Sequence, residues 1–167
     1  MKNKFNSNLY KKEIINLIKL SIEKLKIEYP NYEVLTMSVT SDFSSGISAI
    51  HFDSDNFSKN YLQKEEEKYK YYLEKNDLKR AEFYKPTAEK RITNPADFEL
   101  VFYTEITHNS FSFNDFQDEE NQEGYALLKE ILKENYNYII KELKANSNFE
   151  LTYNNEEEWY NPIKLGE

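Results

Sequence analysis

The chain has 167 residues, a net charge of −8 and no cysteine, and 39% of its residues are hydrophobic and 16% aromatic. So many apolar and aromatic side chains exclude a disordered acidic chain, because their burial offsets the entropy lost on ordering, and the absence of cysteine excludes disulfides and thiolate chemistry. No apolar stretch reaches the roughly 20 residues that span a bilayer, and no secretory signal pattern opens the sequence, so we expect a cytoplasmic protein.

The first half of the chain predicts a helix followed by a hairpin. Residues 9–28 form an amphipathic pattern that ends at Pro30, which cannot continue a helix. Residues 32–53 read as two strands around the turn "SDFSSG", and "YEVLTMSVT" alternates apolar and polar side chains. This alternation predicts a half-buried first strand, with Leu35, Met37 and Val39 facing the core. The helix should bury Ile14, Leu17, Ile18, Ser21, Ile22 and Leu25.

The second half predicts two more helices and two more strands. Residues 56–76 have a helical composition, residues 77–98 have little periodicity, and 98–106 predict a well-buried strand. Residues 122–145 give the clearest helical stripe, and 149–153 a short strand. We therefore predict one α+β domain over residues 1–167, with a small, mainly antiparallel sheet of about four strands packed against the long N-terminal and C-terminal helices. The inner edge of helix 56–76 should be Leu62, Tyr69, Tyr72 and Leu73.

The stretch "HFDSDN" at 51–56 has two interpretations. On an extended strand, His51, Asp53 and Asp55 share one face, which suits a metal or acid/base site. The same carboxylates also stand between a strand and a helix, where Asp55 or Asn56 can cap the helix and favour its dipole. Capping is the simpler interpretation. A metal or catalytic site needs further ligands, and the only other histidine is His108. The sequence also lacks the glycine that a calcium-binding loop has at its turn, after the first acidic residues.

Other catalytic patterns are absent from the sequence. No serine lies in a Gly-x-Ser-x-Gly elbow, and three glycines cannot build a phosphate-binding loop. We therefore predict no catalytic residue, no metal and no cofactor.

The negative charge lies in the last third of the chain. Residues 1–114 carry 17 acidic and 17 basic side chains, whereas residues 115–167 carry 13 acidic and 5 basic ones. This excess repels nucleic acid and anionic lipid, and either serves solubility or steers a basic protein partner. Trp159 is either a core residue or a contact for such a partner. The candidate partner-binding residues are Asp118, Glu119, Glu120, Glu123, Glu156, Glu157, Glu158, Trp159 and Tyr160.

The order of these segments, with the "NPADFE" stretch at 94–99, resembles a bacterial family of unknown function from polymorphic toxin systems. The resemblance spans about residues 10–162. Members of that family are associated with immunity proteins, which are intracellular antidotes to a toxin domain. The resemblance implies a protein that binds a cognate, basic toxin domain such as a nuclease and blocks its active site. Two alternatives stay open: a small His/carboxylate-dependent hydrolase or metal-binding enzyme, and a non-catalytic subunit of a larger assembly.

Overall fold

The computed structural model describes residues 5–110 and 118–164, and for residues 118–121 it describes the backbone alone. The elements follow the order α1 (Ser7–Glu28), β1 (Val34–Asp42), β2 (Ile47–Ser54), α2 (Asp55–Glu74), α3 (Leu78–Phe83), the 3-10 turn η1 (Pro95–Asp97), β3 (Leu100–Thr107), α4 (Asp118–Glu142), β4 (Ala145–Tyr153) and β5 (Asn161–Pro162). The α+β class is confirmed. None of the helices in the described ranges is long and apolar enough to cross a membrane.

The sheet has five strands in the order β3-β2-β1-β4-β5, and it is mixed rather than purely antiparallel. Neighbouring strands pair antiparallel except β1 and β4, which run parallel. The parallel pair arises because α4 carries the chain back along the whole sheet, so β4 starts at the same end as β1. The prediction of about four strands missed β5, which pairs through only two residues.

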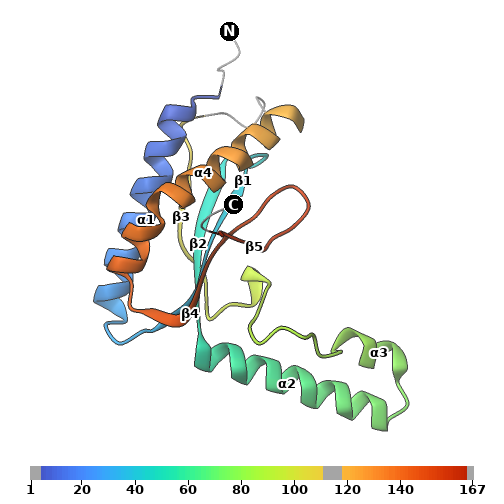
Figure 1. The fold of residues 1–167 in the computed structure, drawn as a ribbon. Coiled ribbons are helices and arrows are strands. Elements are labelled where there is room, and N and C mark those ends of the chain that lie inside the picture. The colour runs from blue at the N-terminus through green and yellow to red at the C-terminus, as the bar shows by residue number, and fades with distance from the viewer. Residues whose placement is uncertain (1–4, 111–117, 165–167) are drawn as a thin grey trace.

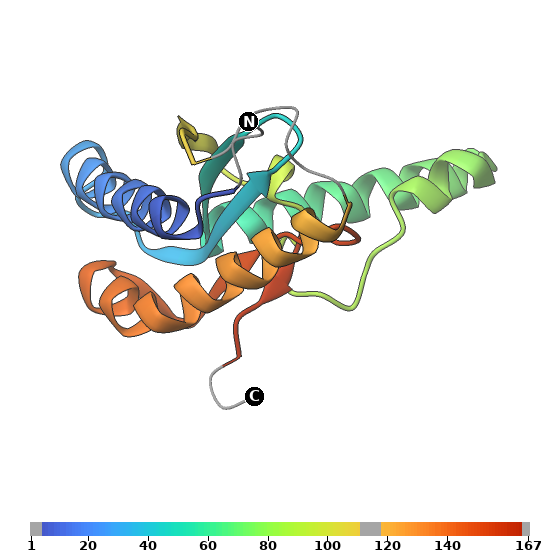
Figure 2. The ribbon, with the colours of Figure 1, turned by 90° about the horizontal axis from the view of Figure 1, so that it is seen from above.

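Helices α1 and α4 lie side by side on one face of the sheet and enclose the core (Figures 1 and 2). Helix α1 begins where the Asn6 side chain accepts a bond from the Leu9 amide, and it ends just before Pro30. All six positions of its predicted stripe are buried, and in α4 Leu128, Ile131 and Leu132 are fully buried. Both long helices were therefore predicted, although α4 spans Asp118–Glu142 rather than 122–145 and β4 already begins at Ala145.

Gly124 lies where α4 approaches the β1–β2 hairpin closely. A Cβ atom at this position would lie 2.5 Å from the ring of Phe43, which is buried in the turn of the hairpin. Tyr125 packs edge-on against the same ring, with the centroids 4.9 Å apart. The glycine therefore allows the start of α4 to pack directly on an aromatic side chain.

Helices α2 and α3 form an arm that extends away from the sheet (Figures 1 and 2). Tyr72 of α2 stacks on Tyr84, the residue that follows α3, with the ring centroids 5.5 Å apart. Ser58 is the one residue of α2 that is fully buried, and Leu73 is exposed, which is contrary to its predicted place on an inner edge. The weak periodicity of residues 77–98 is explained by two short elements, α3 and η1.

Strand β3 lies at the edge of the sheet, and none of its residues is fully buried, so the prediction of a well-buried strand was wrong. Its pairing with β2 is interrupted between Ile50 and Phe52. Phe102 lies opposite this irregularity with a φ of 46°, a backbone conformation that bulky residues rarely adopt. Its side chain remains 59% exposed.

Candidate functional site

The second face of the sheet is polar and nevertheless buried. On β1 it presents Thr36, Ser38 and Thr40, whose alternation with apolar residues predicted a solvent-exposed face. All three are buried, because segments distant in sequence cover this side. Arg91 reaches over it, with Nη1 3.4 Å from Thr36 Oγ1 and Nη2 donating to the Asn148 carbonyl at 2.7 Å. The sheet therefore has an apolar core on one side and an enclosed polar layer on the other.

The strand register brings polar residues of three strands into rows on this face. Ser38 of β1 lies between His51 of β2 and Thr152 of β4. In the described part of the chain, the hydroxyls of Ser38 and Thr152 have no hydrogen-bond partner, although both residues are fully buried. Buried polar atoms normally have a partner, so these two hydroxyls are an exception on this face.

His51 uses both ring nitrogens inside the protein. Its Nδ1 accepts a bond from the Phe102 amide at 3.1 Å, and its Nε2 lies 2.9 Å from Thr40 Oγ1. A neutral ring protonated on Nε2 satisfies both contacts, and burial lowers the pKa of His51 to about 4. Neither nitrogen is free to bind a metal or to transfer a proton.

The predicted trio of His51, Asp53 and Asp55 does not form. Asp53 shares the polar face and accepts a bond from the Glu99 amide at 3.3 Å, and burial raises the pKa of its carboxyl to about 6. Asp55 lies in the first turn of α2 and pairs with Lys59. The cap is Ser54, whose hydroxyl accepts from the Phe57 amide, rather than Asp55 or Asn56. Within the described ranges, no group of three or more His, Asp or Glu side chains is arranged to hold a metal ion.

A hollow of about 850 Å³ opens over this polar face. Thr40 and His51 lie on its floor, the segment 93–96 forms one wall, and Trp159 and Tyr160 form another. Phe102 lies at the rim, on the opposite edge of the sheet from β5. The carboxylates that line the hollow are Glu89, Glu150 and Glu158, and none of its described lining residues is Lys or Arg.

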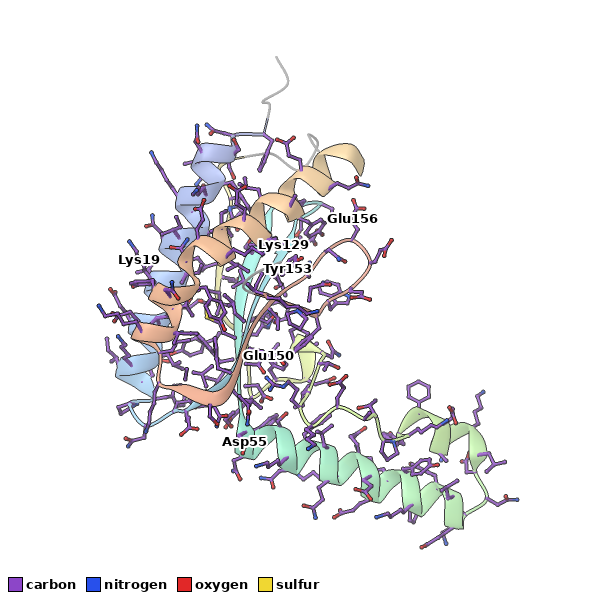
Figure 3. All side chains as sticks on the ribbon, in the orientation of Figure 1. Lys19, Asp55, Lys129, Glu150, Tyr153 and Glu156 are labelled. Carbon is purple, nitrogen blue, oxygen red and sulfur yellow. The ribbon has the colours of Figure 1, made fainter. Side chains whose placement is uncertain are left out.

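Tyr160 is fixed in this wall by Glu150, which Figure 3 labels on β4. The Tyr160 hydroxyl donates to Glu150 Oε2 at 2.5 Å, and Arg91 Nη1 lies 3.5 Å from the same oxygen. Burial and this bond raise the pKa of Tyr160 above its ordinary value, so the phenol stays protonated. Part of the charge of Glu150 is thus compensated by Arg91.

Trp159 lies in the loop between β4 and β5 and is 63% exposed, so it is not a core residue. The loop itself is ordered by hydrogen bonds. Asn155 Oδ1 accepts from the amides of Glu157 and Glu158 at 2.8 and 2.7 Å, and its own amide donates to the Glu158 carbonyl. An exposed indole is therefore presented from a loop of defined shape.

The other predicted partner-binding residues divide between two sides of this loop. Glu156 and Glu157 line a smaller hollow together with Gln122 and Tyr125, which lie near the start of α4. Figure 3 labels Glu156 at this end of the loop. Glu158 lines the larger hollow instead. Glu123 is exposed near the start of α4. Asp118, Glu119 and Glu120 belong to the first turn of α4, and their side chains lie outside the described residues.

A second cluster, on the helix side of the sheet, was not predicted from the sequence. His108 Nε2 lies 2.6 Å from Ser48 Oγ, and His108 Nδ1 lies 2.8 Å from Glu13 Oε2. Burial opposes the ionised form of Glu13, but hydrogen bonds from Asn109, His108 and Ser110 outweigh it and lower the pKa of this carboxyl, while burial lowers the pKa of His108. A neutral His108 thus donates to an ionised Glu13 and accepts from Ser48. Glu13 and His108 are 95 positions apart, so no local pattern connects them.

This order of hydroxyl, imidazole and carboxylate is the one that nucleophilic catalysis uses. Ser48 is 1% exposed, however, and it also bonds Ser41 Oγ, which in turn bonds the Tyr10 hydroxyl. Ser48 lines neither the hollow over the polar face nor the smaller hollow beside Glu156. The cluster connects α1, β1, β2 and the end of β3 through buried hydrogen bonds.

Comparison with known proteins finds no matching family model, no matching curated protein and no matching solved structure. The resemblance to immunity-associated proteins therefore stays a prediction.

Proposed function

We propose that the protein is an immunity protein that binds a basic toxin domain in the cytoplasm and neutralises it by blocking its active site. The observation that carries the proposal is the exposed Trp159 on an ordered acidic loop beside a hollow with carboxylates in its walls. The resemblance described above supplies the class of partner.

The loop has the composition of a binding surface. Interfaces are enriched in aromatic anchors surrounded by polar groups, and tryptophan is prominent among the residues that dominate binding energy. Trp159 follows three consecutive glutamates and precedes Tyr160. Because the backbone of the loop is already ordered by Asn155, a partner does not have to meet the entropic cost of fixing it.

The charge distribution favours a basic partner. Glu156, Glu157 and Glu158 are all exposed in one loop, and Glu123 lies near the start of the neighbouring helix α4. The negative potential of these glutamates raises the rate of encounter with a positively charged protein. A toxin that acts on nucleic acid is such a protein, because it is positively charged where it binds phosphate.

Co-expression tests this function. The protein should rescue cells from the toxin domain encoded beside it and should give no protection against an unrelated toxin. A Trp159→Ala variant, which keeps the fold because the side chain is exposed, should protect less well. Failure to rescue, with both proteins present and the toxin active, would remove the proposal.

The second candidate function is acyl transfer by Ser48, with His108 as the base and Glu13 as the group that orients it. The short contacts among these three residues favour it, and the burial of Ser48 opposes it. A fluorophosphonate probe tests it directly. Labelling that disappears in Ser48→Ala would support a hydrolase, whereas an unlabelled protein would leave the cluster with a role in stability alone.

A further inference from the structure

We propose that the hollow over the polar face of the sheet receives an arginine side chain of the partner. The proposal rests on the proposed function only for the source of that arginine, since the site itself is built from residues of this chain. Its three supports are the charge of the walls, the exposed aromatic rings and the hydrogen-bond acceptors among the lining residues.

The charge of the hollow selects a cation. Glu89, Glu150 and Glu158 line it, and the nearest arginine on the polar face, Arg91, is already engaged with the Asn148 carbonyl and Glu150. His51 on the floor is neutral, because its Nδ1 accepts a bond from the Phe102 amide and burial lowers the pKa of the ring. A phosphate or carboxylate ligand would meet the carboxylates of Glu89 and Glu158, so the charge of the hollow disfavours anions.

The aromatic rings favour a guanidinium over an ammonium group. Trp159 and Phe102 are both mostly exposed, and they approach the hollow from opposite edges of the sheet. A planar guanidinium stacks on an indole while its N–H groups pair with a carboxylate such as Glu158, whereas an ammonium ion is a more strongly hydrated point charge.

The walls and the floor of the hollow offer hydrogen-bond acceptors. A guanidinium carries five N–H donors and no acceptor. The carboxylates of Glu89 and Glu158 can accept these bonds, and the hydroxyl oxygen of Thr40, which also lines the hollow, has a second lone pair beside its contact with His51 Nε2. The volume of about 850 Å³ exceeds one side chain, so part of the loop that carries the arginine also fits.

The experiment exploits the single tryptophan of the chain. Its fluorescence reports on Trp159 alone, so a titration with N-acetyl-arginine amide should change the emission and saturate, with a Kd on the order of millimolar. N-acetyl-citrulline amide has the same shape without the charge, and it should leave the emission unchanged. The lysine compound should bind more weakly than the arginine compound.

Matched variants locate the site. Glu158→Gln should weaken arginine binding roughly twofold to fivefold, which is the range for ion pairs near solvent. Glu23→Gln removes the same charge from an exposed position on α1, on the other side of the sheet, and should bind like the original protein. Equal responses to arginine and citrulline, or equal effects of the two variants, would overturn the proposal.

Failure of the site and failure of the proposed function give different results. A toxin neutralised equally well by Glu158→Gln and by the original protein would remove the arginine site and leave the immunity function. Saturable binding of the arginine compound that Glu158→Gln weakens, without protection from any neighbouring toxin, would keep the site and remove the immunity function.

Discussion

The amide of Phe102 donates a hydrogen bond to His51 Nδ1 at 3.1 Å, and the two rings lie 4.8 Å apart. Phe102 has a positive φ at the point where the pairing of β2 and β3 is interrupted. Such a conformation persists only where its surroundings stabilise it. The buried imidazole provides this support, and it keeps the exposed Phe102 ring at the rim of the hollow.

Replacing His51 should therefore act on stability through Phe102. His51→Leu removes the acceptor and leaves the Phe102 amide without its partner, which should cost about 1–3 kcal/mol of unfolding free energy. His51→Asn can place an oxygen near the position of Nδ1 and should cost less. Urea unfolding of both variants measures the difference. Equal losses would mean that the packing of the ring matters and its hydrogen bond does not.

Asp53 should make stability fall as the pH rises from about 4 to about 6. Its folded pKa is raised to about 6 by burial, whereas the unfolded chain titrates near its ordinary value of about 4. Between these values the folded state keeps a proton that the unfolded state has lost, so the total loss is at most about 3 kcal/mol.

Asp53→Asn cannot ionise and isolates this effect. Relative to the original protein, the variant should gain stability from about pH 4 to about pH 6 and keep a constant difference at higher pH. His51 and His108 titrate in both proteins, so their contributions cancel in the comparison. Urea unfolding across this range measures the difference, and a pH-independent difference would contradict the raised pKa.

The cap of α2 provides a test between neighbouring residues. Ser54→Ala removes the hydroxyl that accepts from the Phe57 amide and should cost about 1 kcal/mol. Asp55→Ala removes only a charge in the first turn and its exposed contact with Lys59, and should cost a few tenths of a kcal/mol. Thermal melts of the two variants settle which residue is the cap. A larger loss for Asp55→Ala would reverse the assignment.

Gly124→Ala should destabilise the protein although alanine favours helices. The new methyl group would overlap the Phe43 ring, and overpacking a buried site costs about 1–3 kcal/mol, which exceeds the helical gain of about 1 kcal/mol. Phe43→Leu makes room for the methyl group. In a double-mutant cycle, Gly124→Ala should be less harmful in the Phe43→Leu background than in the original protein, and additive effects would show that the two sites do not interact.

The acidic loop should control the rate of association with the toxin, and Trp159 the rate of dissociation. Replacing Glu156, Glu157 and Glu158 with Lys should slow association and weaken its salt dependence, since complementary charge acts mainly on encounter. Trp159→Ala should speed dissociation and weaken binding by about 2 kcal/mol or more. Surface plasmon resonance at two salt concentrations separates the two rates.

Thermal melts of the same variants supply the control for this prediction. Both should melt close to the original protein, because the loop is exposed. A large drop in the melting temperature of Trp159→Ala would mean that the indole contributes to folding. Unchanged binding in both variants would remove the loop from the interface.

The sequence alone determined the elements whose signal is local. The buried stripes of α1 and α4 follow from a repeat of about 3.6 residues, and the hairpin of β1 and β2 from alternation around a turn. Each signal lies within one continuous segment of chain and depends on no distant partner. The acidic loop with its tryptophan could also be identified from the sequence, because it is one continuous segment.

Only the tertiary structure decided what covers each surface. The alternation of β1 predicted that Ser38 would face water, yet it is fully buried, and on the same face Arg91, from a distant segment, contacts Thr36. Pairs such as His51 with Phe102 and Glu13 with His108 join residues far apart in sequence. Burial on the second face of a strand and contacts across strands depend on topology, and one strand pattern is compatible with several topologies.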